Sequence, residues 1–240
     1  MTKRAFSGVL ITLAALVTAG FPTRSVALDQ SQASAGLKEA LVTSTVEAVH
    51  VTGRPNGYFS NPAIKIGVPP KLKFLDTGLR AVGYGPQLDQ FVLSMNRAAE
   101  AAAPKAEPIF KKAIMNMSFS DAERIVSGGK HSATDYFKAK TSGELTTAFT
   151  PIVKSTMAQN SVTKQYDALM GKYESGPTGL GGLLGGGGSN VTHNFDITSY
   201  VVEKSLDGLF FVVGQEEAKI RTNPAAQVTP LLKQVFGGLH

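Results

Sequence analysis

The residues best suited to chemistry lie in an alanine-rich stretch, where polar side chains interrupt an otherwise apolar segment. Asn96 and Glu100 are four residues apart, and Arg97 and Glu100 are three apart, so a helix would place all three on one side. An amide, a guanidinium and a carboxylate grouped in this way can line a polar pocket between helices. They equally fit an exposed ion pair beside a helix–helix hydrogen bond, which is the commoner use of such residues.

Further candidate ligand-binding residues fall in the second half of the chain. Glu203 and Asp207 share one face of a predicted helix, and two neighbouring carboxylates can do acid/base work or bind a cation. Glu216 follows on the same helix, and Lys164 and Tyr166 lie in the earlier segment KQY. The alternative for all of them is a solvated helix edge, where charged side chains are usually found.

The sequence contains none of the common catalytic or cofactor motifs. It has no Cys, which excludes disulfides, thiol nucleophiles and Cys-ligated metal centres. Its four His are isolated from one another, and the glycine-rich stretch at 175–190 carries neither a P-loop nor a GxGxxG pattern. We therefore predict no metal and no cofactor, and favour a non-enzymatic protein.

The first 27 residues are typical of a secretory signal peptide. Lys3 and Arg4 precede an apolar run from 8 to 20 that is too short to span a bilayer, and Ser25-Val26-Ala27 offers small residues for cleavage. Removing residues 1–27 takes away three of the 24 basic residues and none of the 18 acidic ones, so the net charge falls from +6 to +3.

The remaining 213 residues contain no run of five basic residues and no apolar stretch of 18 residues. We therefore predict no nucleic-acid partner and no stable membrane insertion after cleavage. The expected location is the bacterial periplasm, with secretion from the cell as the alternative.

Hydrophobic residues recur with a helical period through most of residues 28–240, which predicts a single helical domain. We expect the segment 58–70 to be extended and 175–190 to be a mobile loop, because glycine is costly to order. Capping boxes are predicted at Ser120/Glu123 and Thr141/Glu144, with a kink before Pro151. We expect roughly seven to nine helices. The helical segments are 31–51, 71–82, 87–103, 106–117, a short segment from Ser120 to the glycines at 128–129, one capped by Ser132, one from 142 through Met157, 161–172, 196–222 and a last one from Pro224 to the glycines at 237–238.

Four segments resemble a bacterial exported family, the domain of unknown function forty-one ninety-seven. The resemblance runs from about Gln32 to Gly237, and its most specific part is the closing segment. It implies an exported, helical, single-domain protein and supplies no activity, cofactor or catalytic residue. The glycine-rich stretch is longer here than in the family, where this connection tends to be short and acidic. The segments are FSNPAIKIGVPP (59–70), LSMNRAAEAAAPKAEPIF (93–110), KQYDALMGK (164–172) and YVVEKSLDGLFFVVGQEEAKIRTNPAAQVTPLLKQVFG (200–237).

These observations predict an all-α, orthogonal multi-helix bundle with the helix 196–222 near its centre. The function that fits best is a periplasmic binding or interaction module for a small amphipathic ligand or an envelope protein. The alternative is an enzyme that uses carboxylates such as Glu100, Glu203 or Asp207 on an envelope substrate. The enzyme hypothesis expects these carboxylates to converge in one cleft, whereas the binding hypothesis does not require it.

Overall fold

The computed structural model describes residues 30–81, 83–159, 164, 168 and 196–222, and no strand occurs among them. This confirms the predicted all-α class. The helices predicted at 31–51, 87–103 and 196–222 begin and end close to those positions, because their apolar period is continuous. The helices are α1 (Gln30–Gly53), α2 (Lys73–Ala81), α3 (Gly85–Ala102), α4 (Ala106–Met115), α5 (Phe119–Ser127), α6 (Ser132–Gln159) and α10 (Ile197–Thr222), with short 3-10 turns at Pro70–Leu72 and Ala103–Lys105.

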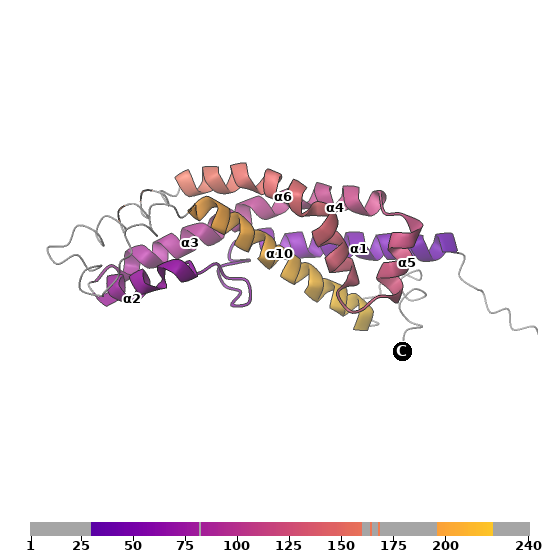
Figure 1. Ribbon diagram of the computed structural model, residues 1–240, viewed down its shortest axis with the longest axis horizontal. Helices are drawn as coiled ribbons and strands as arrows, with labels where there is room; N and C mark the ends of the chain where they lie inside the picture. Colours follow the sequence, from indigo (N-terminus) through magenta and orange to yellow (C-terminus); the bar gives the residue numbers. More distant parts are fainter. Residues whose placement is uncertain (1–29, 82, 160–163, 165–167, 169–195, 223–240) are drawn as a thin grey trace, which may run out of the picture.

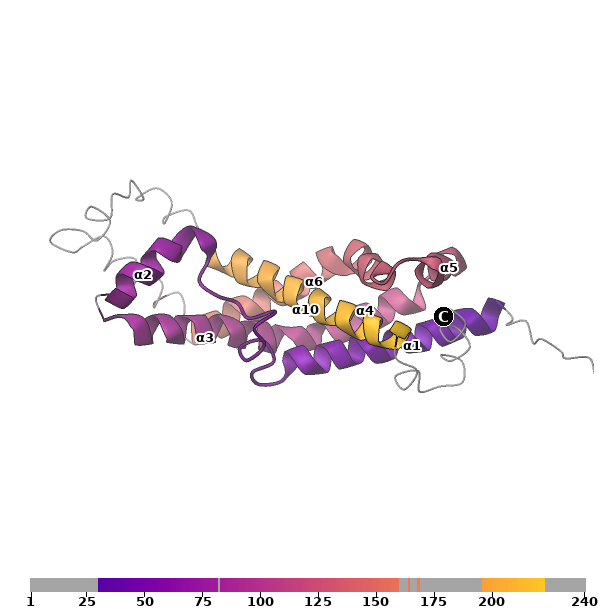
Figure 2. The ribbon, with the colours of Figure 1, turned by 90° about the horizontal axis from the view of Figure 1, so that it is seen from below.

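The helices form an elongated bundle that α10 crosses diagonally (Figures 1 and 2). Helix α10 packs against α1, α3 and α6, so it occupies the central position that its apolar sequence predicted. A cluster of aromatic rings joins it to its neighbours: the Phe110 ring centroid lies 5.2 Å from that of Phe137 and 6.1 Å from that of Phe210. Both contacts are edge-to-face, the arrangement that the ring quadrupoles favour.

The start of α5 corrects one of the two predicted capping boxes. The N-cap is Ser118, whose hydroxyl accepts a hydrogen bond from the Asp121 amide while the Asp121 carboxylate accepts one from the Ser118 amide. Ser120 and Glu123 have the same spacing but lie inside the helix. The S-x-x-D and S-x-x-E patterns overlap here, and a spacing alone does not say which of them coincides with the helix end.

The second predicted capping box, at Thr141/Glu144, was also wrong. Thr141 lies within α6, and its hydroxyl donates to the Phe137 carbonyl one turn back. The two helices predicted on either side of it are therefore one helix of 28 residues. Pro151 is exposed within this helix, where the carbonyl it leaves unpaired can bind water.

The segment between α1 and α2 is a loop, and its turns contradict the extended segment predicted at 58–70 over residues 58–64. Turns occupy 55–60 and 62–64, and Asn56 adopts a left-handed conformation with φ of 66°. Asparagine tolerates this conformation because its short polar side chain can bond locally. The side chains of Tyr58, Ile64 and Ile66 are nevertheless buried in the core, so the loop is packed between helices.

Several predictions fall outside the described residues. They are the signal peptide at 1–27, the glycine-rich loop at 175–190, the helix at 224–236 and most of the helix at 161–172.

The close packing of the loop on α10 predicts opposite effects for two glycine-to-alanine variants. A Cβ at Gly208 would lie 2.5 Å from Cε1 of Tyr58, whereas a Cβ at Gly143 in α6 would meet no atom within 4 Å. Gly208→Ala should lower the free energy of unfolding by about 1–3 kcal/mol through overpacking. Gly143→Ala should raise it by up to about 1 kcal/mol through helix propensity. Urea unfolding of both variants checks this, and a neutral Gly208→Ala would contradict the packing.

Candidate functional site

Asn96 binds the backbone of the loop and does not line an open pocket. Its side-chain oxygen accepts from the Ile66 amide at 2.9 Å, and its amide nitrogen donates to the Ile66 carbonyl at 2.8 Å and to the Val92 carbonyl at 2.7 Å. The side chain is completely buried. Asn96 thus gives the loop the two hydrogen bonds that a neighbouring strand would otherwise supply.

Glu100 fixes the same loop at a second point. One carboxylate oxygen accepts from the amides of Tyr58 and Phe59, each at 3.2 Å, and the other is 2.5 Å from Nη1 of Arg97. Arg97 also donates to the side-chain oxygen of Asn56 at 2.8 Å. The sequence allowed either a polar pocket or an ion pair beside a helix–helix hydrogen bond, and the Arg97–Glu100 ion pair is present. What they hold, however, is this chain's own loop.

Helix α10 completes the attachment of the loop. The Tyr58 hydroxyl donates to the Ser205 carbonyl at 2.5 Å, and the Tyr200 hydroxyl donates to the Gly67 carbonyl at 3.1 Å. Burial raises the pKa of Tyr58 far above its ordinary value, and the charge of Glu100 adds to the effect. Tyr58 therefore stays a neutral hydrogen-bond donor.

Replacing Asn96 should open the loop to proteolysis. Lys65 is exposed, and the next residue, Ile66, is the one whose backbone Asn96 holds. Asn96→Ala leaves a buried amide and carbonyl without partners, so trypsin should cut the Lys65–Ile66 bond about tenfold faster or more. Mass spectrometry of short trypsin digests measures this. Cleavage after Lys130, which is remote in sequence and exposed, is the internal reference.

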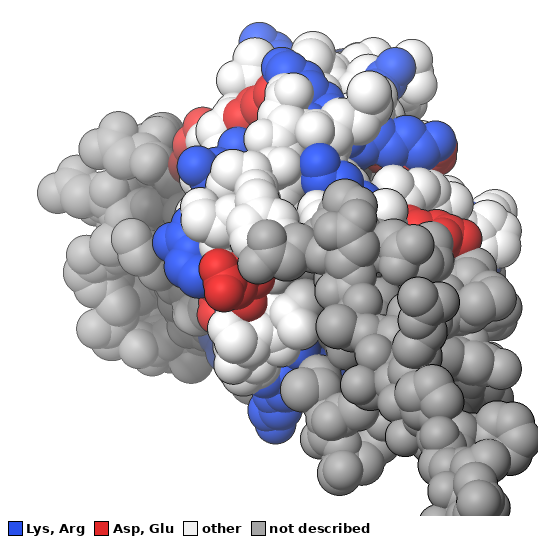
Figure 3. Space-filling model, turned by 90° about the vertical axis from the view of Figure 1, so that its right-hand side faces the viewer, with Lys and Arg blue, Asp and Glu red and all other residues white. Residues whose placement is uncertain are grey.

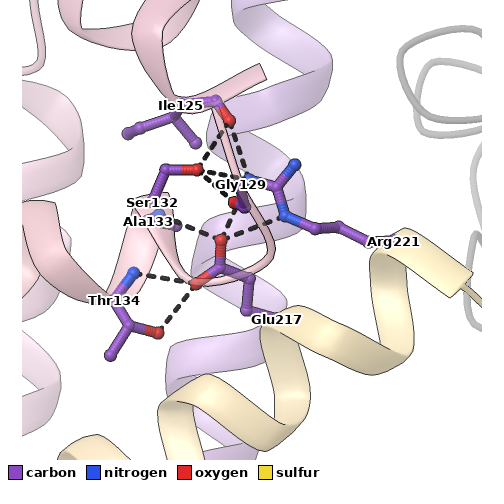
Figure 4. A network of polar contacts seen from close by, with 7 residues as sticks. All are labelled: Ile125, Gly129, Ser132, Ala133, Thr134, Glu217 and Arg221. Atoms are coloured by element: carbon purple, nitrogen blue, oxygen red, sulfur yellow. Dashed lines mark hydrogen bonds and ion pairs between the residues drawn. The ribbon is translucent and has the colours of Figure 1, made fainter. Parts of the chain in front are cut away.

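A second buried carboxylate, Glu217, caps the start of α6 (Figure 4). Its oxygens accept from the amides of Ala133 at 2.9 Å and Thr134 at 2.8 Å, and from the Thr134 hydroxyl at 2.7 Å. Arg221 donates to the same carboxylate at 2.9 Å and also to the Ile125 carbonyl at 2.7 Å. The sequence indicated the Glu217–Arg221 pair by its spacing, but not the amides of a helix 83 residues away.

A groove of about 610 Å³ lies between α6 and α10. One wall is a straight row of α6 side chains at every fourth residue, with a lysine at each end and hydroxyls between. The floor consists of apolar α10 side chains, and acidic residues form the other wall. The α6 row is Lys138, Ser142, Thr146, Thr150 and Lys154. The other lining residues are Asp196, just before α10, and Thr198, Ser199, Val202, Glu203, Leu206, Asp207 and Phe210 of α10.

The groove brings together only part of the predicted site. Glu203 and Asp207 line it, are exposed, and share Lys204 as an ion-pair partner at 3.4 and 2.7 Å. Glu100 is absent from its lining, so the three carboxylates that define the enzyme alternative do not converge.

Two other predicted site residues also lie away from the groove lining. Glu216 forms an ion pair with Lys219, Lys164 is exposed, and Tyr166 lies outside the described residues. The lysine and hydroxyl row on α6 was missed, although its four-residue spacing is visible in the sequence.

Charged side chains elsewhere are mixed in sign. At the end of the molecule shown in Figure 3, basic and acidic residues are interspersed with uncharged ones. Within the described ranges, no three or more His, Cys, Asp or Glu side chains gather in a way that could hold a metal ion. None of the helices described is long and apolar enough to cross a membrane.

Comparison with known proteins gives a family and no activity. No curated protein and no solved structure matches the chain. One family model, described as a protein of unknown function (DUF4197), matches residues 27–237. This match covers most of the chain and agrees with the resemblance seen in the sequence. The chain therefore belongs to the DUF4197 family.

Proposed function

We propose that this chain is an exported, non-enzymatic binding protein of the bacterial envelope, and that the groove between α6 and α10 is its binding site. The proposed location is the periplasm, supported by the signal-peptide pattern at 1–27. The ligand is an elongated amphipathic molecule or a segment of an envelope protein.

The observation that carries the proposal is the contrast between the buried charges and the groove. Glu100 and Glu217 are occupied by amides and arginines of the chain itself. Lys138 and Lys154, by contrast, line an open groove and form no ion pair within the part of the chain that the structure describes. Lys138 lies 5.9 Å from the Phe210 ring centroid. A hydrogen bond from Ser199 lowers the pKa of Asp196, and the charge of Lys154 helps to lower it. Charged groups that line a concave surface without a close ion-pair partner are typical of a binding site.

Blocking the groove tests this proposal. Protein purified from its own compartment should carry a bound molecule or partner in native mass spectrometry. Thr146→Trp, which fills the groove, should remove it, whereas Thr147→Trp should not, because Thr147 is exposed on α6 but does not line the groove. An empty, monomeric mass for the unmodified protein, with no co-purifying partner, would contradict the proposal.

A further inference from the structure

The two walls of the groove carry opposite charge. Lys138 and Lys154 stand at the ends of the α6 wall, about 24 Å apart along the helix. Glu203 and Asp207 lie on the α10 wall, and the Lys204 ammonium near both does not line the groove. Asp196, just before α10, also lines the groove; a hydrogen bond from Ser199 lowers its pKa, and the charge of Lys154 helps to lower it. A molecule in the groove would therefore meet ammonium groups along one flank and carboxylates along the other.

The hydroxyls between the two lysines already have partners for their protons. Ser142 donates to the Lys138 carbonyl at 2.7 Å, Thr146 to the Ser142 carbonyl at 2.8 Å, and Thr150 to the Thr146 carbonyl at 2.7 Å. A partner can therefore cover this wall without burying an unsatisfied hydroxyl donor, which would be costly. The side chains are also short, so a neighbouring backbone can approach closely.

The floor of the groove has the spacing of a helix-packing seam. Val202, Leu206 and Phe210 follow one another at four-residue intervals along α10. Each side chain is less than a tenth exposed. The floor can therefore contribute shape complementarity to a complex but little apolar area that binding would newly bury. The charged flanks must then contribute much of the specificity of any complex.

We propose that the occupant of the groove is an amphipathic α-helix of a partner protein, about 16 residues long, with acidic residues on the flank facing α6 and basic residues on the flank facing α10. This inference rests on the proposed function and names its ligand class. A small amphiphile with one headgroup would use the charge of one wall only, and the length and two-sided charge of the groove fit a helix better.

The opposite charges also set the direction of the bound helix. Turning a helix end for end in the groove exchanges its two flanks, so only one direction places its acidic flank beside Lys138 and Lys154. A helix with one acidic and one basic flank can therefore bind in one direction with both flanks attracted to the groove. A helix with two acidic or two basic flanks has one flank repelled in either direction.

The test uses the full chain and a fluorescently labelled probe peptide of about 18 residues. The probe is built from Ala, Leu, Glu and Lys, with Leu along one face, Glu on one flank and Lys on the other. A second peptide has the same composition in a shuffled order that remains helical without separate flanks. Fluorescence anisotropy measures the Kd of each at about 0.05 M salt, where exposed charges are weakly screened.

The probe should bind about tenfold or more tightly than the shuffled peptide, and Lys138→Glu/Lys154→Glu should weaken it by a similar factor. Lys140→Glu, on α6 outside the groove lining, should not. Equal binding of the two peptides, or equal effects of the groove and control variants, would overturn the inference. If native mass spectrometry then shows a small molecule lost with Thr146→Trp, the proposed function stands and the helical occupant does not.

Discussion

Glu217→Ala is expected to lower the free energy of unfolding by about 3–5 kcal/mol, the usual cost of removing one member of a buried ion pair. The carboxylate is only 4% exposed, and its loss leaves the Ala133 and Thr134 amides at the start of α6 without acceptors. Arg221 also loses the charge it faces, although it keeps the Ile125 carbonyl. Urea unfolding followed by circular dichroism measures the change.

The neighbouring residue provides a matched control. The Glu216 side chain is 12% exposed but pairs with Lys219, which is 61% exposed, so Glu216→Ala should cost less than about 2 kcal/mol. Glu217→Gln should recover only part of the loss, because both carboxylate oxygens face donors and an amide nitrogen would oppose one of them. Equal losses for Glu216→Ala and Glu217→Ala would refute the capping role.

The backbone partners of Glu217 could not be predicted from a single sequence. Its spacing from Arg221 predicted an ion pair, and that pair is present. The more important partners are backbone amides of another helix, and every residue except proline has such an amide. No residue type at 133 or 134 therefore points to Glu217, and the contact exists only because the end of α10 packs beside the start of α6.

The helices themselves were easier to predict than their ends. Periodic burial in α3 and α10 extends over many turns, so many residues indicate the same structure. A helix end depends on two or three residues. The patterns at Ser120 and Thr141 imitate an end, because a hydroxyl within a helix can satisfy itself on the preceding turn, as that of Thr141 does.

The sequence singled out Asn96 and Glu100 as polar residues one turn apart, but their role as loop anchors could not be read from it. The same pattern fits a ligand pocket, a surface ion pair and a loop anchor. The choice between them depends on where residues 54–69 lie, and the turns of that loop contain no periodic signal. In the groove, by contrast, the α6 row could have been found by asking which polar residues repeat every fourth position.

Replacing Glu100 should destabilise the protein by releasing the loop that it anchors. Glu100→Ala removes the acceptor of the Tyr58 and Phe59 amides, and we expect a loss of about 2–4 kcal/mol, since each buried unsatisfied amide is costly. Glu100→Gln should lose less than half of this, because its carbonyl can still accept both amides. The partly exposed Arg97 can turn to water in that variant.

An exposed carboxylate with a similar helical ion pair is the control for Glu100. Glu107 lies 2.6 Å from Lys111, and Glu107→Ala should change the free energy of unfolding by less than about 0.5 kcal/mol. If Glu100 instead served a reaction or a ligand, Glu100→Ala would leave stability nearly unchanged and reduce binding alone. A large loss of stability that Gln largely restores is the result expected of a residue that holds its own chain, and it would leave the groove between α6 and α10 as the place to look for a partner.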